Sequence, residues 1–142
     1  MILARLVTAL FASTTWGGGL PLVSDADMTT LVEQNMCVKY IDEAIAAGWY
    51  SHELPRLMQI MHRESRCIPE ACSTPDRPDQ RKCRDWGLMQ INDYSWKGMV
   101  RREGFKMADL TDPQTNLVFA RHLYELSETS TGCGWTPWNG TC

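Results

Sequence analysis

Six cysteines in a chain of 142 residues limit the possible folds more than any other feature. An even number of cysteines in a short chain indicates disulfides, provided that the chain is exported to an oxidising compartment. We expect up to three disulfides, with about 15 possible pairings, among Cys37, Cys67, Cys72, Cys83, Cys133 and Cys142. A zinc site built from His62, Cys67, Cys72 and Cys83 is the alternative. The spacing lacks the close cysteine pair of structural zinc sites, however, and we expect no metal.

The N-terminal segment has the pattern of an export signal. A positively charged start up to Arg5 is followed by an apolar run to Ala12, and small residues lie near Ala26. This pattern predicts a signal peptide over residues 1–26 and one folded domain over residues 27–142, secreted or periplasmic. A weak membrane anchor over residues 3–23 is the alternative, because glycines and threonines lower its apolarity without adding charge. We expect only transient membrane contact, through this segment.

Size and charge exclude several classes of protein. The length suits a single domain, and the charged fraction of 22% excludes wholesale disorder. A net charge of −3 argues against a nucleic-acid binder, which would carry a strong basic excess. Residues 56–106 nevertheless hold eleven Lys or Arg against seven Asp or Glu, whereas the rest of the chain holds three against ten. This basic excess surrounds the candidate site described below and favours an anionic substrate.

The pattern beyond residue 24 is mainly helical. Apolar residues at three-to-four spacing, together with capping and proline signals, predict four helices: over 24–48, from Glu53, over 95–103 and from Asp112. Prolines, cysteines and charges predict a long loop over residues 68–84, with at most a small hairpin before Trp86. The predicted fold is a small, mainly α domain stapled by disulfides.

Glu64 is the first candidate for chemistry. Leu57, Met61 and Glu64 are spaced at i, i+4 and i+7 and therefore share one helix face. A carboxyl on an apolar face is partly removed from water, which favours the protonated form that a general acid needs. The alternative, judged from position alone, is an exposed ion pair of Glu64 with Arg63 or Arg66.

A second candidate segment covers residues 85–92 and combines an acid, a turn glycine and two amides. The amides of Gln90 and Asn92 suit hydroxyl-rich and acetamido-bearing ligands, because an amide both donates and accepts hydrogen bonds. Asp85 is a candidate second carboxylate, and its alternative role is to brace the turn.

Two tryptophans near the C-terminus form the third candidate group. Trp135 and Trp138 could stack on the apolar faces of sugar rings, and six tryptophans is a high number for this length. The sequence is equally consistent with a structural role, in which both rings close the core beside a disulfide.

Together these segments resemble the lysozyme-like superfamily, and most closely its small soluble lytic transglycosylase (SLT) domains. The sequence over residues 64–71 resembles that family's E-S-x-x-x-P-x-A motif, and residues 87–92 match its G-L-M-Q-I-N motif. Residues 112–117 and the following helix are similar to its D-P-x-x-N-I block. The likeness runs from about Cys37 to Leu126, with three motifs in the family's order. It implies a lysozyme-like α+β domain.

The resemblance also implies a function. The expected substrate is the glycan strand of peptidoglycan, cut at the β-1,4 bond between N-acetylmuramic acid and N-acetylglucosamine. Glu64 would be the catalytic acid and then the base, with Asp85 beside it. Substrate-binding side chains are expected at Ser65, Met89, Gln90, Asn92, Tyr124, Trp135 and Trp138. We expect a monomer without a cofactor and without a nucleic-acid partner.

The chain departs from the family pattern in two places. The family's late A-Y-N-x-G is absent, and residues 134–142, with two tryptophans and a final cysteine, are closer to the end of animal-type lysozymes. Asp85-Trp86-Gly87 likewise resembles the D-Y-G of those enzymes. A hydrolytic lysozyme with Glu64 as acid and Asp85 as second carboxylate is therefore the alternative to a transglycosylase. A non-catalytic exported glycan-binding or structural protein is a further alternative.

Overall fold

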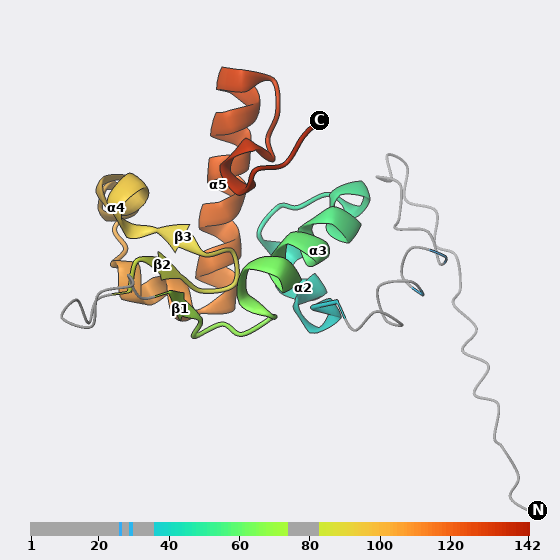
Figure 1. Ribbon diagram of the computed structural model, residues 1–142, viewed down its shortest axis with the longest axis horizontal. Coiled ribbons are helices and arrows are strands. Elements are labelled where there is room, and N and C mark those ends of the chain that lie inside the picture. Colours follow the sequence, from blue (N-terminus) through green and yellow to red (C-terminus); the bar gives the residue numbers. More distant parts are fainter. Residues whose placement is uncertain (1–25, 27–28, 30–35, 74–82) are drawn as a thin grey trace, which may run out of the picture.

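The computed structural model describes residues 26, 29, 36–73 and 83–142 (Figure 1). With η denoting a 3-10 helix, the elements in chain order are η1 (Val38–Tyr40), α2 (Ile41–Ala46), η2 (Ser51–Glu53), α3 (Leu54–Ser65), β1 (Cys72–Ser73), β2 (Asp85–Trp86), β3 (Ile91–Asn92), α4 (Asp93–Arg102), η3 (Met107–Thr111), α5 (Pro113–Thr131) and η4 (Thr136–Trp138). The fold is mostly helical with one small antiparallel sheet. This confirms the predicted fold class.

The first predicted helix is described only in part. Ala26 and Thr29 are helical, residues 30–35 lie outside the described residues, and η1 and α2 follow. The helix ends close to the predicted position, because Gly48 has a φ of 89°, in the region that favours glycine. The predicted signal peptide lies outside the described residues except for Ala26.

Helix α3 forms as its sequence predicts. Pro55 lies in its first turn, where its missing N–H is not needed. The apolar stripe is buried against the core, with Leu54 1% exposed and Leu57, Met58 and Met61 fully buried. The helix ends at Arg66, which adopts a left-handed conformation with a φ of 54°. The last turn therefore carries Glu64 to the edge of the core.

Helix α5 is the longest described element, with 19 residues, and begins where Asp112-Pro113 predicts. The Asp112 carboxylate accepts a hydrogen bond from the Thr115 N–H at 2.8 Å and caps the helix. Figure 1 shows α5 between the sheet and α4 on one side and α2 and α3 on the other. Among the described residues, no helix is long and apolar enough to cross a membrane.

The sheet has one strand more than a hairpin would supply. Its order is β1-β2-β3, antiparallel throughout, and Asp85 lies opposite Ser73 on one neighbour and Asn92 on the other. The third strand leads directly into α4, which begins two residues before the predicted short helix. Part of the predicted loop, residues 74–82, lies outside the described residues.

All six cysteines form disulfides, which confirms the expected three bridges. Cys37 is bonded to Cys67, Cys72 to Cys83 and Cys133 to Cys142. By loop-closure entropy each bridge stabilises the fold by roughly 3 kcal/mol. The zinc alternative is wrong, since its three cysteine ligands, Cys67, Cys72 and Cys83, are all committed to these bonds.

A buried ion pair links the start of α3 to α5. Arg121 Nη1 donates to Glu53 Oε2 at 2.6 Å, and the two side chains are 10% and 6% exposed. The Arg121 guanidinium also lies 4.9–5.3 Å from the ring centroids of Trp49, Tyr50 and Tyr124. Burial lowers the pKa of Arg121, but the hydrogen bond to Glu125 and the charges of Glu53 and Glu125 outweigh it, so that its pKa is raised. The ion pair therefore holds the start of α3 against α5.

Candidate active site

Glu64 lies in the last turn of α3, at the boundary between the core and solvent. Leu57 and Met61 on the same face are fully buried, whereas the Glu64 side chain is 26% exposed. Its Oε1 accepts hydrogen bonds from Arg63, at 3.0 Å from Nε and 2.6 Å from Nη2. Among the described residues, Oε2 has no hydrogen-bond partner. One oxygen is therefore held in place, while the other accepts no hydrogen bond from the described residues.

Arg63 connects this carboxylate to the C-terminal segment. Its Nη2 also donates to the Trp138 carbonyl oxygen at 2.6 Å. The sequence predicts Arg63 only as an ion-pair partner of Glu64, and that ion pair is present. The second contact spans 75 positions, and helical periodicity carries no signal for it. Arg63 thereby joins the candidate acid to η4.

Trp138 continues the connection into the second motif. Its indole Nε1 donates to the Met89 carbonyl oxygen at 2.9 Å. The Met89 N–H in turn donates to Asn116 Oδ1 at 2.9 Å. A series of hydrogen bonds therefore runs from Glu64 through Arg63, Trp138 and Met89 to Asn116. It joins the three motif segments that the sequence places far apart.

The turn over residues 87–90 is tightly built. Gly87 has a φ of 72°, and a Cβ there would lie 2.1 Å from the Leu110 carbonyl oxygen, so that only glycine fits. Gln90 also has a positive φ, of 47°, and its Nε2 donates to the carbonyl oxygens of Gly87 at 2.9 Å and Ala71 at 3.2 Å. Its amide nitrogen therefore braces the turn, and within the described residues its Oε1 has no partner.

Asp85 lies on β2 and is held on both sides. Its Oδ1 accepts a hydrogen bond from Asn92 Nδ2 at 2.7 Å, and its Oδ2 accepts one from the Ser73 hydroxyl. Asn92 also caps α4, because its Oδ1 accepts from the Ser95 N–H at 3.0 Å. The bracing role expected from position is present, and Asp85 has a fixed orientation. Ser73 is not predicted by the sequence, since a serine in a loop carries no distinctive signal.

Two predicted substrate-binding residues face the interior. Ser65 is 5% exposed, and its hydroxyl donates to the Met61 carbonyl oxygen at 3.0 Å within the same helix. Met89 is fully buried. Both side chains lie beneath the surface near Glu64 and the turn, so that they support neighbouring groups from within.

The C-terminal aromatic residues form a buried cluster. Trp135 and Trp138 are each 5% exposed, and Tyr124 is 8% exposed. The ring of Trp135 stacks on that of Trp49, with centroids 5.5 Å apart, and meets the Tyr124 ring edge-on at 4.8 Å. Of the two interpretations that the sequence left open, the observed burial favours core closure beside the Cys133–Cys142 disulfide.

Tyr94 is an aromatic residue that the sequence-based prediction missed. It lies in the first turn of α4, two positions after Asn92, and is 95% exposed. A ring left almost entirely in water beside a candidate site is available for stacking. Its signal in the sequence is an aromatic residue two positions after the second motif, and this signal is weaker than that of the paired tryptophans.

One comparison with known proteins identifies a family for this chain. A protein-family model described as the transglycosylase SLT domain matches residues 41–136. The match spans α2 to the start of η4 and includes every residue of the hydrogen-bonded series except Trp138. No curated protein and no solved structure matches the chain significantly.

Proposed function

The chain belongs to the transglycosylase SLT domain family within the lysozyme-like superfamily, and we propose that Glu64 is the catalytic acid and base of its peptidoglycan cleavage. The family acts on peptidoglycan, which lies outside the cytoplasmic membrane. The bond proposed to be cut is the β-1,4 linkage between N-acetylmuramic acid and N-acetylglucosamine. The observation that carries the proposal is the series of hydrogen bonds that links Glu64 to the two other motif segments.

The proposed reaction has two proton transfers. Protonated Glu64 donates to the glycosidic oxygen as the bond from that oxygen to C1 of the muramoyl residue breaks. The resulting carboxylate then accepts the proton of the muramoyl 6-hydroxyl, whose oxygen bonds to C1. The products are a 1,6-anhydromuramoyl end and a free 4-hydroxyl on the leaving N-acetylglucosamine, and Glu64 has recovered its proton. No water is consumed.

We assign the remaining site residues to two groups. Asp85, Gln90, Asn92 and Tyr94 would contact the sugar chain, since they bear carboxylate, amide or exposed ring surfaces. Ser65, Met89, Tyr124, Trp135 and Trp138 would act beneath it, because their side chains are buried. In this assignment the buried group keeps Arg63 and the turn in position.

Hydrolysis is the second candidate reaction, and the fixed orientation of Asp85 favours it. A retaining hydrolase needs a second carboxylate close to the anomeric carbon, and two donors hold Asp85 in one orientation. Asp85→Asn separates the two reactions, since asparagine can keep both contacts while removing the charge. A hydrolase would lose its turnover, whereas a transglycosylase that relies on Glu64 alone would retain most of it.

We further propose how the protein reaches its substrate. Residues 1–26 would direct export, and membrane contact would be transient and made through this segment alone. Residues 27–142 would act as a secreted or periplasmic monomer. The basic excess over residues 56–106 supports an approach to an anionic wall.

Glu64→Gln tests the proposed catalytic role. Glutamine keeps the size and an acceptor oxygen for Arg63 but cannot donate an acidic proton. We expect clearing of a cell-wall suspension to fall by at least about 100-fold while sedimentation with the walls persists. Glu128→Gln, at an exposed carboxylate on α5, is the matched control and should clear walls like the wild type. Wild-type clearing by Glu64→Gln would end the proposal, and equal loss in both variants would point to surface charge instead.

A further inference from the structure

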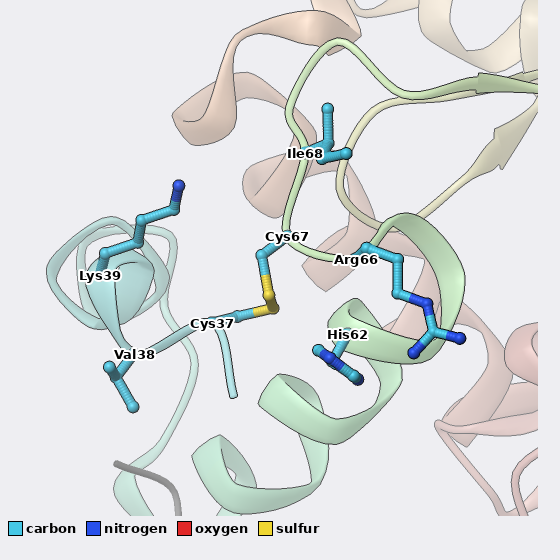
Figure 2. A pocket seen from close by; sticks show the side chains of 7 residues that line it. All are labelled: Cys37, Val38, Lys39, His62, Arg66, Cys67 and Ile68. Carbon is cyan, nitrogen blue, oxygen red and sulfur yellow. A yellow bond between two sulfur atoms is a disulfide. The ribbon is translucent and has the colours of Figure 1, made fainter. Parts of the chain in front are cut away.

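A pocket of about 320 Å³ lies at the end of α3, apart from the residues assigned above. It is lined by Cys37, Val38, Lys39, His62, Arg66, Cys67 and Ile68 (Figure 2). Figure 2 shows the Cys37–Cys67 disulfide between Lys39 on the η1 side and His62 and Arg66 on the α3 side. The pocket is thus formed where a covalent bond joins two elements, and its size suits a small ligand.

The lining combines basic and apolar groups. Lys39, His62 and Arg66 are basic, and no acidic side chain is among the described residues that line the pocket. In the described part of the chain none of these three forms an ion pair, whereas Arg63, Lys97 and Arg121 do. Lys39 Nζ lies 4.9 Å from the centroid of the Tyr40 ring, and among the described residues its ammonium donates no side-chain hydrogen bond. An anionic group with short aliphatic parts would complement this lining.

The pocket residues are not those of the family motif. Arg66, Cys67 and Ile68 occupy the three unspecified positions of E-S-x-x-x-P-x-A, which begin two residues after the proposed catalytic Glu64. The pocket is therefore a feature of this chain and is not dictated by the motif that surrounds it.

The position of the pocket relative to Glu64 limits what could occupy it. His62 and Glu64 are two residues apart on α3, which separates their directions by about 200° around a helix roughly 10 Å wide. A ligand that reaches both must pass the end of the helix. A peptide of five residues extends at most about 17 Å, enough to cover that path. In peptidoglycan, a short peptide with free carboxylates and alanine methyl groups is attached to muramic acid, the sugar proposed to react at Glu64.

We propose that this pocket binds a carboxylate of the peptide attached to muramic acid. The proposal rests on the proposed function and names a second part of the substrate. Lys39 and Arg66 supply the charge, and Val38, Ile68 and the disulfide contact the aliphatic part of the peptide. Substrates with intact peptides are then preferred over bare glycan strands.

Direct binding tests the pocket without catalysis. A free tetrapeptide with the sequence of the peptide attached to muramic acid is titrated into the wild type and into the pocket variant, Lys39→Gln/Arg66→Gln. The heat of binding or the intrinsic fluorescence is measured. We expect at least tenfold weaker binding to the double variant and to the wild type when the peptide carboxylates are amidated. Arg101→Gln/Arg102→Gln removes the same charge from exposed positions on α4 and should bind like the wild type. Equal binding by both double variants, or by the amidated peptide, would overturn the proposal.

Two additional measurements distinguish peptide binding from a folding defect and from a phosphate site. Arg66 has a positive φ, so if the double variant does not fold, Lys39→Gln alone serves, with a smaller loss expected. Inorganic phosphate replaces the peptide in a parallel titration, and binding as tight as that of the peptide would make this a phosphate site and overturn the assignment.

Activity on glycan strands stripped of peptide reports on the proposed function alone. The pocket variant should leave that activity unchanged, because Lys39 and Arg66 would contact only the peptide. Loss of peptide binding with intact cleavage of bare strands is the expected combination. Loss of bare-strand cleavage in the folded pocket variant would contradict the separation of the pocket from the catalytic site.

Discussion

The fully buried side chain of Asn116 holds Met89 in place. Asn116 Oδ1 accepts the Met89 N–H at 2.9 Å, while its Nδ2 donates to the carbonyl oxygens of Trp86 at 3.0 Å and Leu110 at 2.9 Å. One amide therefore satisfies three backbone groups from two segments. The late motif thus supports the turn that carries Gln90, and its asparagine has a structural explanation.

Asn116→Ala should strongly destabilise the domain, because three backbone groups lose their partner. Each unsatisfied buried group costs about 1–3 kcal/mol, so we expect the free energy of unfolding to fall by about 3 kcal/mol or more. Urea denaturation measures this. Gln114→Ala, on the same helix and without a side-chain hydrogen bond among the described residues, should change stability by less than about 0.5 kcal/mol. Similar midpoints for the two variants would contradict the assigned role.

Gly87→Ala should also be destabilising, for a steric reason. The new Cβ would lie 2.1 Å from the Leu110 carbonyl oxygen and 2.3 Å from Asn116 Nδ2, at a φ of 72°. We expect a loss of more than about 2 kcal/mol. Gly98→Ala provides the control, because Gly98 lies within α4 and a Cβ there would have nothing within 4 Å. This substitution should raise the free energy of unfolding by about 0.5–1 kcal/mol. Thermal unfolding of both variants measures these changes. An unchanged melting temperature for Gly87→Ala would contradict the prediction and show that the turn can relax around the added Cβ.

Tyr94→Ala tests the exposed ring as a substrate contact. We expect KM for glycan strands to rise about tenfold, equivalent to ~1.4 kcal/mol of binding, while kcat and the melting temperature stay near wild-type values. The reason is that a ring 95% exposed adds little to folding but can cover a sugar face. Tyr94→Phe keeps the ring and should retain a wild-type KM. An unchanged KM in Tyr94→Ala would remove Tyr94 from the site.

Tyr124 should contribute to stability in a pH-dependent way. Burial raises the pKa of Tyr124, and the negative charge of Glu53 adds to this effect. As the pH rises, the unfolded chain therefore loses the Tyr124 proton before the folded protein does. The contribution of Tyr124 to the free energy of unfolding is complete below about pH 10 and decreases above it. The free energy of unfolding should decline less steeply for Tyr124→Phe than for the wild type between about pH 9 and 11. Tyr94→Phe should keep the wild-type slope, and identical slopes for all three proteins would contradict this account.

Local signals in the sequence predicted the helices well. Pro55 and Asp112-Pro113 mark the starts of α3 and α5, and the apolar spacing of Leu57 and Met61 defines the buried face. These are near-neighbour effects, which periodicity and capping residues encode directly.

The contacts that assemble the site were not predictable in the same way. The hydrogen bonds from Arg63 to Trp138 and from Trp138 to Met89 join residues 75 and 49 positions apart. They depend on the tertiary packing of α3, the turn and η4, and single-sequence patterns do not record that packing. The same reason left the disulfide pairing and the burial of Trp135 open in the sequence.

Analysis of the products by mass spectrometry tests the central claim most directly. Purified peptidoglycan is digested with the wild-type protein, and a digest with Glu64→Gln serves as the blank. If Glu64 drives transglycosylation, the new ends are 1,6-anhydromuramoyl residues, about 18 Da lighter than hydrolysed ends because one water is not added, and they are absent from the blank. New ends that are exclusively reducing, or anhydro ends formed equally by Glu64→Gln, would contradict it.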